Sequence, residues 1–118
     1  MQGLRNLRVI DFSNRIAGAY ATKLMADAYA EVIKVEPPEG DALRHWTASE
    51  TDLQGRDSAL FQFLNTSKKA VVGRPVDPHI LELMQGADLV VETFEPGVIE
   101  AIDPAERFPG LVVLSISP

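Results

Sequence analysis

The segment Ser13–Gly18 carries the residue types best suited to bind an anionic ligand. It lies between an apolar run and a helical segment, and it contains Arg15. Free amides at a helix N-terminus attract anions, and a guanidinium group adds positive charge beside them. The alternative is that Ser13 or Asn14 only caps the helix and Gly18 only allows close packing. These residues alone leave both interpretations open.

Two further polar segments add cations and an aromatic ring. Lys68 and Lys69 follow the polar residues 65–67, and paired ammonium groups beside a polar turn can hold a phosphate or diphosphate. Solvated lysines at the start of a strand are the alternative. The segment Thr93–Gly97 contains Phe94, whose ring could stack on an adenine or join the core.

Other reactive side chains lack the partners that catalysis requires. Glu36 ends an apolar run, where a dinucleotide-binding fold places its ribose-binding acid, but Gly18 alone does not make the three-glycine turn of that fold. A surface carboxylate is therefore the alternative for Glu36. His45 and Trp46 could contact a substrate. Neither histidine has neighbours at metal-ligand spacing, and no nucleophile motif is present, so we predict no metal and assign no catalytic residue.

Composition excludes several classes of protein. The chain has 118 residues, 46% of them hydrophobic, which suits one small domain. It has no cysteine, which excludes disulfides and thiolate chemistry. Its net charge of −6 disfavours nucleic acid, and no apolar run approaches the ~20 residues of a membrane span. The first apolar run begins at Leu7, which leaves no room for a signal peptide. We therefore expect a cytoplasmic protein.

The negative charge is unevenly distributed along the chain. Residues 1–30 carry four basic and two acidic side chains, whereas residues 31–118 carry seven basic and fifteen acidic ones. A small phosphorylated ligand remains compatible with this balance if a few cations converge locally.

Strands and helices are expected to alternate. The apolar runs that predict strands are Leu7–Phe12, Val32–Val35, Ala70–Val72, Leu89–Val91 and Leu111–Ile116. Continuous β-branched runs are typical of strands buried on both faces of a parallel sheet. Helices are predicted at Ile16–Tyr29, Ser58–Leu64, Pro78–Gly86, Pro96–Ile102 and Pro104–Phe108. This order predicts the α/β class, with a Rossmann-like open parallel sheet and helices on both faces.

Helical spacing also predicts which face of the first helix is buried. The residues on that face are Ala17, Tyr20, Ala21, Leu24, Met25 and Ala28. The stretch Pro37–Asp57 has no such periodicity and is polar, and a connection of that length is usually functional or mobile.

The last apolar run, Leu111–Ile116, is expected to be a central or near-central strand. Only Ser117 and Pro118 follow it, although a buried strand needs helices on both faces. We therefore expect residues 1–118 to be one incomplete domain, truncated after its fifth strand. Either the chain is a fragment or another chain completes the fold.

Four segments occur in a distinctive order between about Leu4 and Ser117. They are LRVIDFSNRIAGAYATKLMADAYAEVIKVEPPEGDALRHW, LFQFLNTSKKAVV, ADLVVETFEPGVIEAID and PGLVVLSIS. Together they resemble the N-terminal part of the class III CoA-transferase family. This is the formyl-CoA and carnitine-CoA transferase group that also contains α-methylacyl-CoA racemase.

The resemblance implies a Rossmann-like large domain, an interlocked ring-shaped homodimer and a CoA site built from strand-end loops. It places the CoA-contacting residues in three loops: Asn14, Arg15, Ile16 and Ala17, then Leu64, Asn65 and Lys68, then Thr93 and Phe94. Pro37 and Ala101 stand where the family commonly has arginine, and Thr93 stands where it commonly has asparagine. Each missing cation would weaken binding of the CoA phosphates by about 1–3 kcal/mol.

The chemistry of the resembled family lies beyond residue 118. Its transferases use an aspartate nucleophile that follows a glycine-rich segment after the run Leu111–Ile116. No catalytic residue is therefore carried over to this chain. The resemblance implies acyl-CoA and a carboxylic acid as substrates, with CoA bound as a substrate and no permanent cofactor. Racemisation in place of transfer stays open.

Two other functions remain as alternatives. One is a non-catalytic, degenerate CoA-transferase-like module that needs a partner chain, which the missing cations and the uncovered last strand suggest. The lesser alternative is an NAD-dependent oxidoreductase, which the strand–helix–strand unit and Glu36 suggest.

Overall fold

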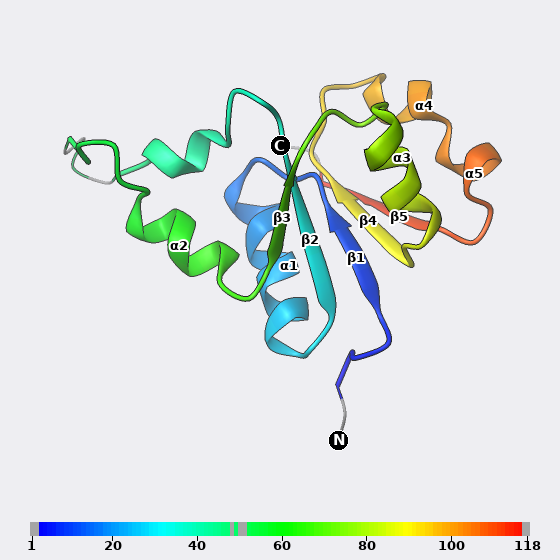
Figure 1. Cartoon of the computed structure of the whole chain (residues 1–118), viewed down its shortest axis with the longest axis horizontal. Helices are drawn as coiled ribbons and strands as arrows, with labels where there is room; N and C mark the ends of the chain where they lie inside the picture. Colours follow the sequence, from blue (N-terminus) through cyan, green and yellow to red (C-terminus); the bar gives the residue numbers. More distant parts are fainter. Residues whose placement is uncertain (1–2, 48, 50–51, 117–118) are drawn as a thin grey trace.

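Five short parallel strands form one open sheet in the computed structural model, which describes residues 3–47, 49 and 52–116. The strands are β1 (Arg8–Asp11), β2 (Glu31–Glu36), β3 (Lys69–Val72), β4 (Leu89–Glu92) and β5 (Val112–Ser115). Their order in the sheet is β3-β2-β1-β4-β5, and every neighbouring pair is parallel (Figure 1). The predicted α/β class and open parallel sheet are confirmed.

Helices cover both faces of this sheet. They are α1 (Ile16–Asp27), α2 (Ala59–Asn65), α3 (Pro78–Gln85), α4 (Val98–Ile102) and α5 (Pro104–Arg107). Helices α1 and α2 lie on one side, and α3, α4 and α5 lie on the other (Figure 1). All five predicted helices are present, and their ends shift by one to two residues, as helix ends commonly do.

The central strands are buried on both faces because their side chains alternate between two apolar clusters. In β1, Val9 packs with the α1 residue Ala26, whereas Ile10 packs with Ile80 and Met84 of α3. Val9 and Ile10 have no exposed surface. A continuous apolar run therefore predicts a central parallel strand correctly here.

The prediction of a central position for Leu111–Ile116 is wrong within the described residues. This run forms β5, which pairs only with β4 and lies at the edge of the sheet. Val112 is 62% exposed and Leu114 is 41% exposed. Within the described residues, no strand pairs with the outer side of β5.

The predicted buried face of α1 is also wrong. The helix buries Gly18, Ala19, Thr22 and Ala26, whereas Tyr20 is 48% and Leu24 is 51% exposed. Small residues let the helix lie close to the sheet. The Thr22 hydroxyl donates a hydrogen bond of 2.7 Å to Asp11 at the end of β1. This buried polar contact fixes the rotation of the helix, and apolar periodicity cannot detect it.

The long connection after β2 (residues 37–57) packs against the rest of the fold near its beginning. Ala42–His45 form a 3₁₀ helix, and the Asp41 side chain caps it by accepting from the Leu43 amide at 2.8 Å. Leu43 is buried and packs in a cluster with Phe61 and Leu64 of α2. Positions 48, 50 and 51 of this connection lie outside the described residues.

The same substitution on opposite faces of α1 tests the corrected rotation. Ala19→Leu should lower the free energy of unfolding by about 1–3 kcal/mol, because Ala19 is fully buried and a larger side chain overpacks the core. Ala17→Leu, on the exposed face, should change it by less than about 0.5 kcal/mol. Urea unfolding of both variants measures the difference, and equal effects would contradict this orientation.

Candidate functional site

The carboxyl ends of β1 and β4 lie side by side at the point where the strand order reverses. Open α/β sheets bind their ligands at such a point. The loops that leave these two strands are joined by hydrogen bonds. The Asn14 amide donates to Thr93 Oγ1 at 3.1 Å, and Thr93 Oγ1 donates to Asn14 Oδ1 at 2.8 Å. The structure thus brings the first and third predicted loops together.

The N-terminus of α1 presents unused amides beside this junction. Arg15 is the N-cap residue with extended backbone, and no side chain caps the helix. The amides of Ile16, Ala17 and Gly18 have no hydrogen-bond acceptor among the described residues. Such amides together with the helix dipole favour a negatively charged ligand. The alternative in which Ser13 or Asn14 caps the helix is wrong for this structure.

Gly18 is required because the chain approaches itself closely at this turn. A Cβ atom at Gly18 would lie 2.4 Å from Ser13 Cβ and 2.9 Å from Ser13 Oγ. Any larger residue would push Ser13 and the start of α1 apart. The single glycine therefore allows this turn to close without a three-glycine motif.

Two hollows open at this edge of the sheet. One, of about 260 Å³, lies beyond β1, β2 and β3 and is mainly apolar. Its walls include Phe12, Pro37, Pro75 and Phe94, and the Phe12 and Phe94 rings are 5.2 Å apart and tilted by 45°. Arg74 is the charged residue of its lining, and its guanidinium pairs with the exposed Glu39 at 3.0 Å. A flat aromatic group flanked by a cation suits this hollow.

The second hollow, of about 510 Å³, lies beyond β4 and β5 and is acidic. Its charged lining residues are Arg15 and the carboxylates Glu92, Glu95 and Glu100. Three carboxylates against one guanidinium disfavour a phosphate inside it. Arg15 stands at the start of α1, and the free amides that follow it are the part of this edge best suited to an anionic group.

A buried ion pair lies beneath the loop that follows β1. Lys68 Nζ contacts Asp11 Oδ2 at 3.0 Å, Asn65 Oδ1 at 3.0 Å and the Ala19 carbonyl at 3.1 Å. Both side chains are almost fully buried. Burial lowers the pKa of Lys68, and the Asp11 carboxylate partly opposes this shift. With three acceptors around it, the ammonium group points into the protein and has no free donor for a phosphate.

The second predicted loop is therefore placed differently from the other two. Leu64 is buried against Ala19 of α1, and the Asn65 amide nitrogen donates to the Phe61 carbonyl at 2.9 Å. Lys68 connects this loop to the site through its contacts with Asp11 and with the Ala19 carbonyl. Lys69, in contrast, is exposed and pairs with Glu31.

A second buried ion pair was not found by sequence reasoning. Lys34 Nζ lies 2.7 Å from Asp41 Oδ2, and both side chains are buried. A sequence signal for such buried charges exists: a charged residue stands inside an apolar run. Asp11 in VIDF and Lys34 in VIKV are the two examples. Arg74, which lines the apolar hollow, was also missed. Its position two residues after the end of β3 was the signal.

Glu36 is fully engaged by protein groups. Its carboxylate accepts from Arg44 Nε at 2.5 Å, from Arg44 Nη2 at 2.8 Å and from the Asp41 amide at 2.8 Å. The Arg44 guanidinium, against the opposing effect of burial, holds the pKa of Glu36 below its ordinary value of 4.5. Arg44 also pairs with Asp57 at 2.7 Å. Glu36 has no free oxygen directed at a ribose, which removes the main support for NAD.

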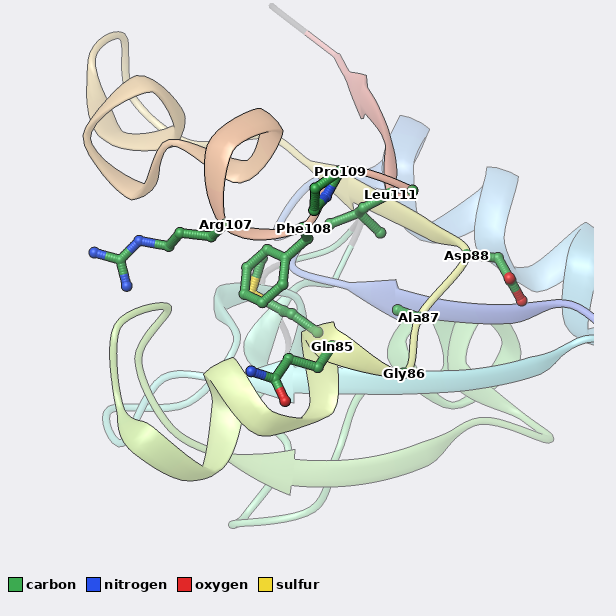
Figure 2. Close-up of a pocket in the computed structure, with 10 residues that line it drawn as sticks. Gln85, Gly86, Ala87, Asp88, Arg107, Phe108, Pro109 and Leu111 are labelled. Atoms are coloured by element: carbon green, nitrogen blue, oxygen red, sulfur yellow. The ribbon is translucent and has the colours of Figure 1, made fainter.

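Other parts of the described chain add no competing site at this edge. A third hollow, of about 440 Å³, lies at the opposite edge, where β4 and β5 begin, and the Arg107 side chain beside it extends away from the sheet (Figure 2). Among residues 3–47, 49 and 52–116, no cluster of histidine and carboxylate side chains could hold a metal ion. Within the same residues, no helix is long and apolar enough to cross a membrane.

Comparison with known proteins identifies consistent relatives. The model of "CoA-transferase family III" matches residues 4–118. A succinyl-CoA:mesaconate CoA-transferase from Haloarcula hispanica is 37% identical over 98% of this chain and 32% of its own length. An acyl-CoA transferase from Fusarium pseudograminearum is 37% identical over 84% of this chain and 24% of its own. The chain therefore spans a third or less of these relatives.

Solved structures share the fold. A hypothetical protein from Mycobacterium tuberculosis superimposes with a TM-score of 0.81 at 32% identity, over 99% of this chain and 34% of that one. A CAIB/BAIF family protein from Brucella suis gives a TM-score of 0.79 at 30% identity, over 95% of this chain and 32% of that one.

The Glu36–Arg44 contact predicts how stability depends on pH. A carboxyl group whose pKa is lowered on folding stabilises the protein above its unfolded pKa and loses that contribution as pH falls through the folded pKa. Glu36→Gln should cost about 1–3 kcal/mol at pH 7, and the difference from the wild type should shrink below about pH 4.5. Urea unfolding between pH 7 and pH 3 measures both effects.

A matched control is Glu106→Gln, at an exposed carboxylate without an ion pair in the described part of the chain. It should leave the free energy of unfolding nearly unchanged at every pH. A loss for Glu36→Gln that stays constant down to pH 3 would contradict the assigned role of Arg44.

Proposed function

This chain belongs to CoA-transferase family III, and we propose that it is the CoA-binding segment of an enzyme that moves CoA between an acyl-CoA and a carboxylic acid. The observation that carries the proposal is the junction of Asn14 with Thr93 beside the uncapped amides of α1. This junction lies at the carboxyl edge of the sheet, where the fold binds ligands.

The parts of CoA match the chemistry available at this edge. The diphosphate suits the free amides of Ile16 and Ala17 together with Arg15, because each contributes positive potential. The adenine ring suits the apolar hollow, where it would lie against Phe94. Arg74 at the same hollow supplies a cation close to where the family commonly has an arginine in place of Pro37.

The second loop takes part in this proposal from beneath the ligand. Leu64 and Asn65 hold the end of α2, and Lys68 neutralises Asp11. We propose that these residues contribute to CoA binding by fixing the first loop. The reacting aspartate that the family resemblance implies is assigned to no residue of this chain.

The homodimer of the family resemblance also remains a proposal. Exposed apolar side chains on α1 and α2 support it: Tyr20, Leu24 and Phe63 are about half exposed. Exposed apolar groups gathered on neighbouring helices are typical of surfaces covered by another chain or segment.

A non-catalytic module is the second candidate. The acidic hollow beyond β4 favours it, because Glu92, Glu95 and Glu100 weaken the attraction for CoA phosphates. Ala101 supplies no compensating cation. In such a module the α/β fold would be kept for assembly with a partner chain, without CoA exchange.

Calorimetric titration of the chain with CoA and, separately, with NAD tests the binding proposal. CoA should bind and NAD should not. Arg15→Ala should weaken CoA binding by about 1–3 kcal/mol, because it removes a cation beside the α1 amides. Arg5→Ala is the matched control, since Arg5 stacks on Tyr29 away from the ligand loops and its loss should leave CoA binding unchanged. Folded chain that binds no CoA would overturn the proposal.

Transfer itself is tested with the full-length gene product. A panel of acyl-CoAs is incubated with carboxylic acids, and exchange of CoA between them is followed by mass spectrometry. Exchange with at least one pair is expected. Folded full-length protein that binds CoA but exchanges it with no acid would favour the non-catalytic module.

A further inference from the structure

One peptide unit of the loop between β1 and α1 (residues 12–15, called the ligand loop below) is held at both of its ends. The Ser13 carbonyl accepts from Lys34 Nζ at 3.1 Å, and the Asn14 amide donates to Thr93 Oγ1 at 3.1 Å. These two groups belong to the same trans peptide, so they point in opposite directions. Lys34 on β2 and Thr93 after β4 therefore clamp the Ser13–Asn14 peptide from two sides.

The rest of Ser13 is held by Asp11. Its amide donates to Asp11 Oδ1 at 2.8 Å, and its hydroxyl donates to the same oxygen at 2.5 Å. Ser13 is 1% exposed, so none of its polar groups is available to a ligand. Its only evident role is to fix the direction in which the chain enters the α1 N-terminus.

Burying the Lys34 ammonium group costs free energy because the group loses its hydration. Its side chain is 3% exposed, and its charge is balanced by Asp41, whose side chain is 1% exposed. A buried ion pair contributes little more to stability than apolar residues of the same volume would, but it fixes geometry closely. Asp41 also accepts a hydrogen bond from the Leu43 amide, which stabilises the start of the 37–57 connection. Lys34 thus links that connection to the ligand loop.

We propose that Lys34 is a positioning residue for the ligand site: by holding the Ser13 carbonyl, it directs the Asn14 amide to Thr93 and the free α1 amides toward the ligand. Lys34 does not touch the ligand itself. The effect of Lys34 on ligand binding rests on the proposed CoA site. The contacts of Lys34 and Thr93 with the Ser13–Asn14 peptide are present in the chain without ligand.

The test uses the chain with Lys34→Met and Asp41→Asn combined, which removes both charges and leaves no unpaired buried ion. The matched control combines Lys69→Met and Glu31→Gln, because this ion pair on the neighbouring strands is exposed and remote from Ser13. The amide resonances of the folded variants are recorded by ¹⁵N NMR, and CoA is then titrated. The Lys34 variant should shift the amides of Asn14 to Ala17 and raise the dissociation constant for CoA roughly tenfold. The control should do neither.

The outcomes separate this inference from the proposed function. Wild-type chain that binds no CoA overturns the proposed function, while the amide shifts still test the clamp. A folded Lys34 variant with unchanged amides at Asn14 to Ala17 and an unchanged CoA dissociation constant overturns the positioning role. A loss of stability with unchanged affinity would do the same, because a structural role alone predicts it.

A measurement on unmodified chain covers the case in which the double variant does not fold. The Lys34 side-chain ammonium should give an ¹⁵N signal protected from exchange, and this signal should shift on CoA addition although Lys34 has no contact with the ligand. The exposed Lys69 ammonium serves as the internal reference. A Lys34 signal that exchanges as rapidly as that of Lys69 would contradict the clamp.

Discussion

The Asp11 carboxylate at the end of β1 is the contact on which the other parts of the site depend. It accepts hydrogen bonds from Ser13, from Thr22 of α1 and from Lys68 before β3. These partners come from the loop after β1, from the first helix and from the segment that precedes the third strand. One buried charge therefore sets the rotation of α1, the path of the loop and the position of the segment that precedes β3. A buried carboxylate is tolerated only because all these donors converge on it.

The polar interior explains why this small fold can hold a ligand loop rigidly. Two Lys–Asp pairs lie under the loop, and each lysine also donates to a backbone carbonyl. Apolar packing fixes how far apart elements lie, but it does not fix the orientation of a single peptide unit. Directional contacts to buried charges do so, which is what an amide-based binding site requires.

The distribution of charge divides the carboxyl edge of the sheet into two unlike regions. The side beyond β1, β2 and β3 is apolar with Arg74, and the side beyond β4 and β5 is acidic. The proposed CoA site lies at this edge, and its part best suited to the anionic groups is Arg15 with the free α1 amides. The acidic side is also the observation that favours the non-catalytic module. The choice between the CoA-binding segment and that module depends on how strongly these carboxylates repel the phosphates of CoA.

The sequence by itself determined the elements of the fold. The apolar runs identified every strand, and the alternation of strands and helices identified the parallel sheet, because these features depend on neighbouring residues. Tertiary structure alone decided the buried face of α1 and the inward direction of Lys68. Each depends on residues far apart in the chain, such as Lys68 with Asp11 or Thr93 with Asn14. A buried charge has no periodic signature, so its partner becomes known only when the chain has folded around it.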